Sequence, residues 1–185
     1  LLSGIVNNPE QHLSELPLLT QAERHQLLVE WNHTQVEYPQ NQCFHQLFEA
    51  QVEQTPDAIA VVFKNQQLTY RQLNQRANQL AHHLQKLGVK PEFKVGLCFE
   101  RSPEMIVGLL GILKAGGAYL PLDPTYPQER LTFMLSDSQV PILLTTQNLA
   151  AKLPEHQAQV VCLDTDWATI TGESEENLNS GVTVK

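Results

Sequence analysis

The stretch SPEMIVGLLGILKAGGAYLPLDPTYPQER, residues 102–130, decides the fold. Its first half is apolar on nearly every side, which predicts a helix that is buried on several sides. The apolar residues are Met105, Ile106, Val107, Leu109, Leu110, Ile112 and Leu113. Ser102 can cap the start of this helix, and Gly116 and Gly117 are suited to end it. Residues 118–120 then predict a short strand, and the prolines that follow turn the chain into a further helix.

The chain from residue 43 onward alternates strands with helices. Runs of apolar and β-branched residues predict strands at 58–63, 67–69, 94–99, 142–145 and 160–163. Apolar positions at helical spacing predict helices at 44–54, 70–87, around 131–135 and at 148–152. The strand at 94–99 has almost no polar alternation, which is typical of a parallel strand covered on both faces. We therefore predict an α/β fold with a mainly parallel sheet and helices on both faces.

The composition places the chain among globular proteins. Of its 185 residues, 42% are hydrophobic and 17% are charged, which suits one domain with or without an extension. The net charge is −8 and the basic residues form no stripe, so we expect no nucleic-acid partner. No run approaches the ~20 apolar residues that span a bilayer, so we expect no membrane partner.

The cysteines indicate the redox compartment of the protein, and the first residue indicates that the chain is part of a longer one. The three cysteines lie far apart, without CxxC spacing or a targeting segment, which predicts reduced thiols and a cytoplasmic protein. Cys98 lies inside an apolar strand and is expected to be a core residue, not a nucleophile. Because the chain begins at Leu1, not at Met, we expect it to be a piece of a longer protein.

Residues 1–40 differ from the rest of the chain. Thr20 and Glu23 form a capping box, which opens a helix with Leu27, Leu28 and Trp31 on one face. A polar strip that contains a proline follows this helix. We predict an interdomain linker over residues 1–40, with one amphipathic helix that docks on a neighbour, and a domain over residues 41–185.

The motifs that usually carry chemistry are absent from the sequence. It has no GxGxxG after a strand, no GxxxxGK[ST], no GxSxG, no HExxH and no Cys/His cluster. His25, His33 and His45 lack other ligands at metal spacing and are expected on the surface. His82 and His83 are adjacent in a helix, where they cannot chelate one metal together, and are expected to be solvated. We therefore assign no catalytic, cofactor-binding or metal-binding residue.

Three acids and two glycines in the chain have structural interpretations. Asp123, between two prolines, is expected to brace the turn before the next helix. Asp164 and Asp166 have no third ligand nearby and are expected to be exposed loop acids. Gly108 and Gly111 lie within the buried helix, where they would allow it to pack closely on the sheet.

Three segments of the chain resemble a known family. LKAGGAYLPLD at residues 113–123, followed by PTYPQERL, resembles a core motif of the adenylation domains of non-ribosomal peptide synthetases. These domains belong to the superfamily of acyl-CoA ligases and firefly luciferase. LTYRQL at residues 68–73 resembles the first core motif of the family, with Gln72 where an acidic residue is usual. LPLLTQAERHQLLVEWNHT resembles the junction between a condensation domain and the adenylation domain that follows it.

The resemblance implies a function for the parent protein. It would use ATP and Mg²⁺ to convert an amino acid into an aminoacyl adenylate, releasing pyrophosphate. It would then pass the acyl group to the phosphopantetheine thiol of a downstream carrier domain. In that family the phosphate-binding loop and the substrate-binding residues come later than the matched region. The chain is thus expected to be truncated before the phosphate-binding loop, as a scaffold that is inactive alone.

The partners implied are the rest of the adenylation domain, an upstream condensation domain that contacts residues 1–40, and the carrier domain. Two alternatives stay open. The first is a free-standing, doubly wound module that binds a nucleotide at the carboxyl ends of its strands. The second is a docking piece that uses the first forty residues and the acidic tail, residues 172–180, as its interface.

Overall fold

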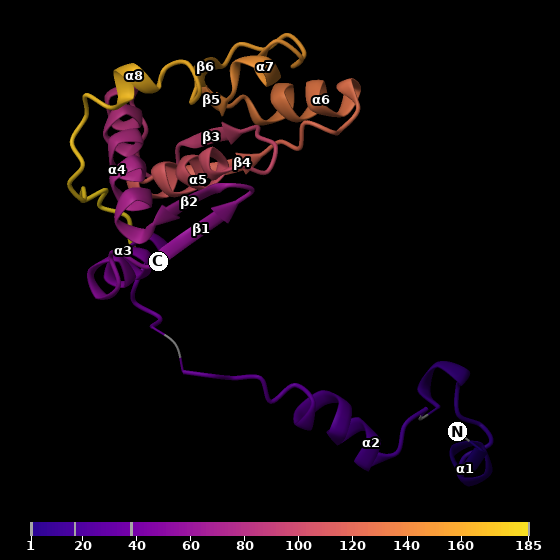
Figure 1. The fold of residues 1–185 in the computed structure, drawn as a ribbon. Coiled ribbons are helices and arrows are strands. Elements are labelled where there is room, and N and C mark those ends of the chain that lie inside the picture. The colour runs from indigo at the N-terminus through magenta and orange to yellow at the C-terminus, as the bar shows by residue number, and fades with distance from the viewer. Residues whose placement is uncertain (1, 17, 38, 185) are drawn as a thin grey trace. The chain divides into compact units, whose positions relative to one another are not determined.

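The structure, a computed structural model, describes residues 2–16, 18–37 and 39–184. The chain forms two compact units, Leu1–Pro39 and Gln40–Lys185. The second unit carries nearly all of the regular structure (Figure 1). Its elements in order are α3 (Phe44–Gln54), β1 (Ile59–Phe63), β2 (Gln66–Thr69), α4 (Tyr70–Lys86), β3 (Lys94–Leu97), α5 (Pro103–Ala115), β4 (Ala118–Pro121), α6 (Gln128–Ser138), β5 (Ile142–Thr145), α7 (Gln147–Ala150), β6 (Gln159–Cys162) and α8 (Trp167–Ile170).

The main sheet has four parallel strands in the order β4-β3-β5-β6, whereas β1 and β2 form a separate antiparallel hairpin. The chain passes from β3 through α5 to β4 on one side, and then returns through α6 to β5 on the other side of β3. β3 is therefore an interior strand, as its unbroken apolar sequence predicted. The predicted strands are all present, with bounds that differ by a few residues.

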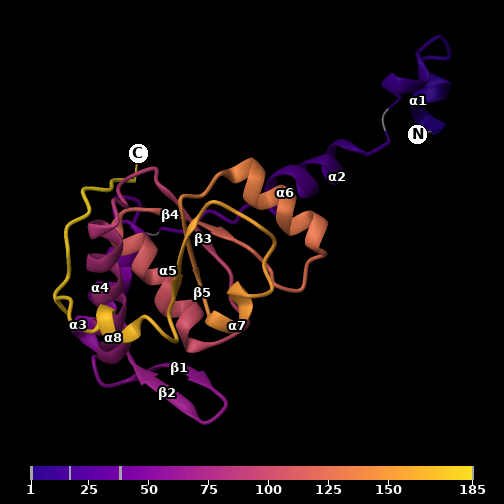
Figure 2. The same ribbon diagram turned by 90° about the horizontal axis from the view of Figure 1, so that it is seen from above.

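Helices cover both faces of this sheet (Figure 2). On one face, α4 and α5 enclose the larger core cluster, to which β5 contributes Ile142 and Leu144. On the other face, Leu131 and Leu135 of α6 pack in a cluster with Leu143 of β5. Neighbouring residues of β5 thus point to opposite faces, as strand geometry requires. The prediction of an α/β fold with helices on both faces is confirmed.

Helix α5 is the centre of the larger cluster. Ser102 Oγ accepts a hydrogen bond from Met105 N at 3.3 Å, and Gly116 ends the helix at a φ of +95°. A Cβ atom on Gly108 would lie 2.8 Å from Leu97 Cδ1 of β3, which confirms close helix–sheet packing there. A Cβ atom on Gly111 would instead lie 2.7 Å from Leu80 Cδ2 of α4. The prediction for Gly111 was therefore wrong in its partner, because this glycine permits helix–helix contact.

The end of the chain is more ordered than the predicted acidic loop. It includes the short helix α8, which no sequence pattern predicted, and residues 171–184 then run alongside α4 (Figure 1). Side chains of α4 donate hydrogen bonds to this stretch, for example Gln79 Nε2 to Thr171 O at 3.0 Å. The acidic tail therefore covers part of its own unit.

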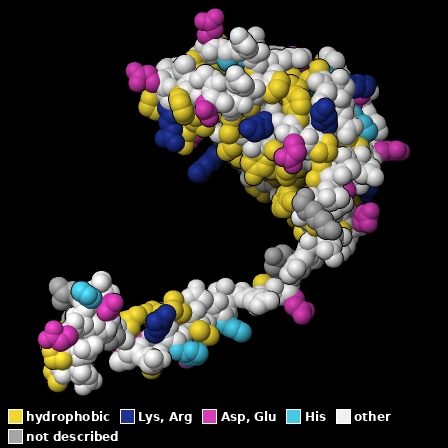
Figure 3. Space-filling model, turned by 180° about the vertical axis from the view of Figure 1, so that it is seen from behind, with side chains coloured by type: hydrophobic (Ala, Val, Ile, Leu, Met, Phe, Trp, Pro, Cys, Tyr) yellow, Lys and Arg dark blue, Asp and Glu magenta, His cyan; other side chains and the backbone are white. Residues whose placement is uncertain are grey.

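The first unit contains short helical pieces: α1 (Leu2–Asn7), a 3₁₀ turn η1 (Leu13–Glu15), α2 (Gln21–His25) and a π-helical turn η2 (Gln26–Glu30). The capping box is confirmed, since Thr20 N donates to Glu23 Oε2 at 2.7 Å and Glu23 N donates to Thr20 Oγ1 at 3.2 Å. Leu27, Leu28 and Trp31 are exposed. Apolar side chains accordingly lie on the surface of this unit (Figure 3).

Candidate functional site

A pocket of about 470 Å³ lies at the carboxyl ends of β3, β5 and β6. Its walls are the segments that follow these strands, the tip of the β1–β2 hairpin, and Arg76 of α4. The connection from β3 leads to one side of the sheet and that from β5 leads to the other, so the topological switch point lies between these strands. Ligands of open α/β sheets bind in the crevice at such a point. This pocket is therefore the candidate site.

The charged side chains around the pocket are balanced in sign. The basic residues are Lys64, Arg76 and Arg101, and the acidic residues are Glu100, Glu104 and Asp164. The guanidinium of Arg76 lies 5.9 Å from the ring centroid of Trp167, close enough for a cation–π contact. Asp164 accepts hydrogen bonds from Gln147 N at 3.0 and 3.1 Å, so this carboxylate supports the start of α7. The pocket offers no net positive charge to a polyanion.

The residues of this pocket do not fit a nucleoside triphosphate with magnesium. The described residues that line it include no glycine, so no glycine-rich turn presents its backbone amides to phosphates. Within residues 2–16, 18–37 and 39–184, no three His, Cys, Asp or Glu side chains are grouped so that they could hold a metal ion.

The acids singled out by the sequence have structural partners. Asp123 Oδ1 accepts hydrogen bonds from Thr125 N at 2.9 Å and Thr125 Oγ1 at 2.7 Å, which confirms that it braces the turn. These hydrogen bonds hold the pKa of Asp123 below its usual value. Asp166 Oδ2 accepts a hydrogen bond from Cys162 N at 2.8 Å. Asp164 is exposed as predicted, whereas Asp166 is half-buried at the end of β6.

Cys98 is confirmed as a core residue. Its side chain is 0% exposed, and it packs in the cluster under α6. Burial raises the pKa of its thiol to about 11, so the thiol stays protonated and is a poor nucleophile at neutral pH. All three cysteines are free.

Two predictions about histidines were wrong. His25 and His33 are exposed as expected, but His45 is only 6% exposed because it lies on the inner face of α3. Burial lowers the pKa of His45. His82 is half-buried, and its Nε2 lies 3.1 Å from the carbonyl oxygen of Glu176. Its neighbour His83 is also half-buried. Helical spacing identified the apolar stripes but not the polar positions that a distant segment covers.

Sequence reasoning also missed the burial of Lys114, which lies in the last turn of α5. Its side chain is 0% exposed and pairs with Glu49 of α3. The spacing could have indicated this burial. Lys114 follows Gly111 by three residues and Val107 by seven, so it lies on the same face of the helix as these two buried residues. The pocket was missed for a different reason, since several separated segments of the chain build it.

The topology is that of a doubly wound α/β sheet, and the pocket lies at its switch point. Comparison with known proteins narrows this class of fold. Residues 48–183 match the AMP-binding enzyme family, so the chain belongs to that family. No helix among the described residues is long and apolar enough to cross a membrane.

The relatives are very large proteins. The chain is 54% identical over 177 residues to one of the linear gramicidin synthase proteins of Brevibacillus parabrevis, covering 96% of this chain and 4% of that protein. It is 46% identical over 173 residues to gramicidin S synthase 2 of Brevibacillus brevis, and the match covers 94% of this chain and 4% of that protein. The chain thus spans about 4% of the length of these relatives.

Solved structures agree with this family. The nonribosomal peptide synthetase FmoA3 superposes with a TM-score of 0.75 at 34% identity, covering 83% of this chain and 16% of that one. FmoA3 with AMPPNP bound gives a TM-score of 0.73 at 33% identity, and the match covers 85% of this chain and 17% of the FmoA3 chain. The resemblance to non-ribosomal peptide synthetases stated from the sequence motifs is confirmed.

Proposed function

We propose that this chain is the N-terminal scaffold of an adenylation domain whose parent synthetase activates an amino acid with ATP. The parent would form an aminoacyl adenylate, release pyrophosphate and load the acyl group onto a carrier-domain phosphopantetheine thiol. The observation that carries the proposal is the continuous match of residues 48–183 to the AMP-binding enzyme family. The similar synthetase FmoA3 has been solved with AMPPNP and with α-methyl-L-serine-AMP, which supports the same chemistry for the parent.

The role of this chain in the parent would be to hold the sheet and its turns in place. The core motif at residues 113–123 forms the last turn of α5, then β4 and the turn braced by Asp123. Its side chains serve packing and turn geometry, which is why no catalytic residue is assigned to it. ATP and Mg²⁺ would be held by residues outside this chain.

The exposed apolar surface supports a partner in the rest of the adenylation domain. A groove of about 630 Å³ runs between α3, the β1–β2 hairpin and α5, and its walls are mainly apolar. Phe44 and Val62 on its rim are 63% and 64% exposed. Open apolar surface of this kind marks an interaction site. Because the chain spans 16% of FmoA3, we assign the remainder of the adenylation domain as the occupant.

Residues 1–40 would link this scaffold to an upstream condensation domain, and a carrier domain would follow downstream. The π-helical turn that follows the capped helix exposes Leu27 and Leu28, and Trp31 is exposed at its end, which gives the linker an apolar docking face. Deleting residues 1–35 is expected to weaken contact with the condensation domain in a binding assay. The circular dichroism of the second unit should be unchanged.

Amino-acid-dependent exchange of pyrophosphate into ATP tests the main proposal. The full synthetase that contains this chain is expected to catalyse exchange with its own amino acid, and the 185-residue chain alone is expected to show none. Exchange by the isolated chain would overturn the assignment of a scaffold. Absence of exchange by the full synthetase with every proteinogenic amino acid and with non-proteinogenic ones, α-methyl-L-serine included, would overturn the assigned activity.

The pocket at the switch point favours one alternative, a module that binds a nucleotide by itself. Calorimetry of the isolated chain with ATP and with FMN distinguishes this alternative from the scaffold proposed above. We expect no heat of binding, because the charges of the pocket are balanced and its lining includes no glycine. Binding that disappears in Arg101→Ala and persists in the hairpin variant Lys64→Ala would favour the alternative.

A further inference from the structure

The last residues of the second unit form a strap over helix α4. The strap is defined as residues 171–184, and it leaves α8 and runs beside α4 (Figure 1). At its start, the buried side chains of Gln79 and Asn78 donate to backbone oxygens of the strap: Gln79 Nε2 to Thr171 O at 3.0 Å, and Asn78 Nδ2 to Glu175 O at 2.6 Å. The first residues of the strap are thus held by α4.

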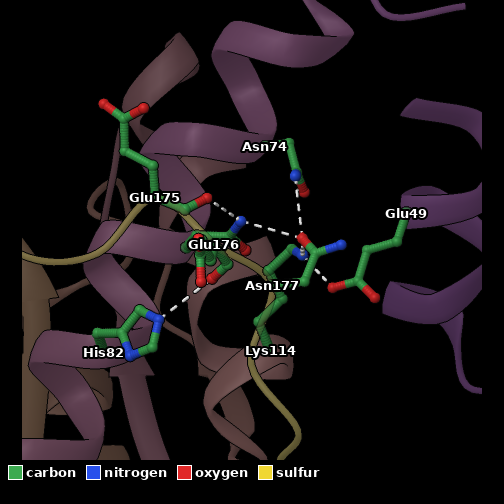
Figure 4. A network of polar contacts seen from close by, with 8 residues as sticks. Glu49, Asn74, His82, Lys114, Glu175, Glu176 and Asn177 are labelled. Carbon is green, nitrogen blue, oxygen red and sulfur yellow. Dashed lines mark hydrogen bonds and ion pairs between the residues drawn. The ribbon is translucent and has the colours of Figure 1, made fainter. Parts of the chain in front are cut away.

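At the middle of the strap, one amide oxygen joins three elements. Asn177 Oδ1 accepts hydrogen bonds from Asn74 Nδ2 and Asn78 Nδ2 of α4, each at 3.0 Å, and from Lys114 Nζ of α5 at 3.3 Å (Figure 4). Asn177 is exposed, whereas the side chain of Lys114 is 0% exposed. Asn177 therefore lies on the solvent side of a buried cation.

The buried cation has a counter-ion on a third helix. Lys114 Nζ pairs with Glu49 Oε1 of α3 and lies 6.0 Å from the ring centroid of Phe48. Burial lowers the pKa of Lys114, and the hydrogen bond and charge of Glu49 oppose this effect. A buried charge is tolerated when it is paired and hydrogen-bonded. Lys114 meets this condition only with both Glu49 and the strap in place.

Beyond Asn177 the strap makes few hydrogen bonds and is held mainly by packing: Leu178 lies against the larger core cluster, and Ser180 and Val182 lie beside Gly116. Cys43 Sγ lies 3.9 Å from Val182 O, a weak thiol contact, and Gly181 N bonds within the strap to Asn179 Oδ1. Nearer its start, Lys86 pairs with Glu173; the Lys86 side chain is 69% exposed, so solvent screens this pair although the Glu173 side chain is only 13% exposed. Asn177 is thus the last polar anchor between the strap and helices α4 and α5.

We propose that Lys114 is a latch: its buried ammonium, neutralised by Glu49, fixes Asn177 and so holds the distal half of the strap, residues 178–184, against the second unit. The ion pair acts on the position of the strap more than on the stability of the core, because replacing both charges of a buried pair by neutral groups of similar size often leaves stability unchanged. Removing only one charge leaves the other buried without a partner and destabilises the whole fold.

The test separates the latch from general stability by comparing backbone order parameters from ¹⁵N relaxation with thermal unfolding of the 185-residue chain. In the double variant Lys114→Met/Glu49→Gln, order parameters at 178–184 should fall from about 0.85 to below about 0.6, while those of α4 and α5 stay near 0.85. Either single variant is expected to unfold at a lower temperature than the double variant.

Two further variants keep the proposal testable whatever the double variant does. Asn177→Ala removes the acceptor and should release residues 178–184 with both charges intact, whereas Asn177→Asp keeps an acceptor and should hold them. The matched control is Lys86→Met, which breaks the exposed ion pair of the same strap and should leave the order parameters unchanged. An unchanged strap in both the double variant and Asn177→Ala would overturn the latch. An equal loss of order in strap and core would do the same.

Discussion

Two helices of this chain begin with the same local signal and differ in everything that follows. In α4, Thr69 N donates to Gln72 Oε1 at 3.0 Å and Gln72 N donates to Thr69 Oγ1 at 3.2 Å. In α2, Thr20 and Glu23 make the same reciprocal pair. Yet α4 continues for 17 residues, whereas α2 has 5 residues before it passes into a π-helical turn.

The difference lies in what the helices bury. Helix α4 places five apolar side chains on one stripe inside the larger core: Leu73, Ala77, Leu80, Ala81 and Leu84. Helix α2 and the turn after it bury no residue. A capping box therefore determines where a helix starts, and tertiary burial determines how far it continues and how stable it is.

Truncating one leucine in each helix should give the largest contrast. Leu80 is 0% exposed and contacts α5, so Leu80→Ala is expected to lower the free energy of unfolding by about 2–5 kcal/mol. Leu28 is 60% exposed, so Leu28→Ala should change it by less than about 0.5 kcal/mol. Urea unfolding of both variants measures the difference. Comparable losses would show that the first unit buries Leu28 in solution.

Removing the two caps should give a smaller contrast. Thr69→Ala is expected to cost about 1 kcal/mol of global stability, since α4 is part of the core. Thr20→Ala should leave global unfolding unchanged and act only locally. The hydrogen bonds from Thr20 hold the pKa of Glu23 below its usual value, so this pKa should rise in Thr20→Ala, as NMR titration would measure. A global loss from Thr20→Ala would contradict the expectation that a helix which buries no residue contributes little to global stability.

The smallest expected contrast is in the pH dependence of stability, to which His45 should contribute and His25 should not. Burial lowers the pKa of His45 from 6.5, and Glu49 and Lys114 are its charged neighbours. Because its pKa is lower in the folded chain, His45 binds a proton more readily when the chain is unfolded. The free energy of unfolding should therefore fall as the pH decreases from about 7 to 5. His45→Gln should reduce this slope in urea unfolding, and His25→Gln, at an exposed side chain, should not. An unchanged slope in His45→Gln would mean that its imidazole is accessible to solvent.

Most of the fold could be predicted because its signals are local. The apolar helix after Ser102, its stop at Gly116 and the capping box at Thr69 are each written within a few residues of sequence. The alternation of strands and helices then restricts the topology to a parallel sheet. Helix α8, a single turn of four residues, was not predicted.

The polar interior could not be predicted, because it depends on contacts between distant segments. Lys114 is 65 residues from Glu49 and 63 residues from Asn177, so no local pattern shows that its charge is satisfied. The burial of His45 depends on how α3 packs. The pocket likewise gathers short pieces that follow β3, β5 and β6, and these pieces share no motif.

The separation of Lys114 from Asn177 also has a consequence for synthesis on the ribosome. At about 5–20 residues per second, roughly 3–13 seconds pass between the addition of residue 114 and that of residue 177. Glu49 has already been made, so the nascent chain can neutralise the ammonium before it can seal it from water. Closure of the strap over Lys114 is therefore expected to follow the pairing of Lys114 with Glu49.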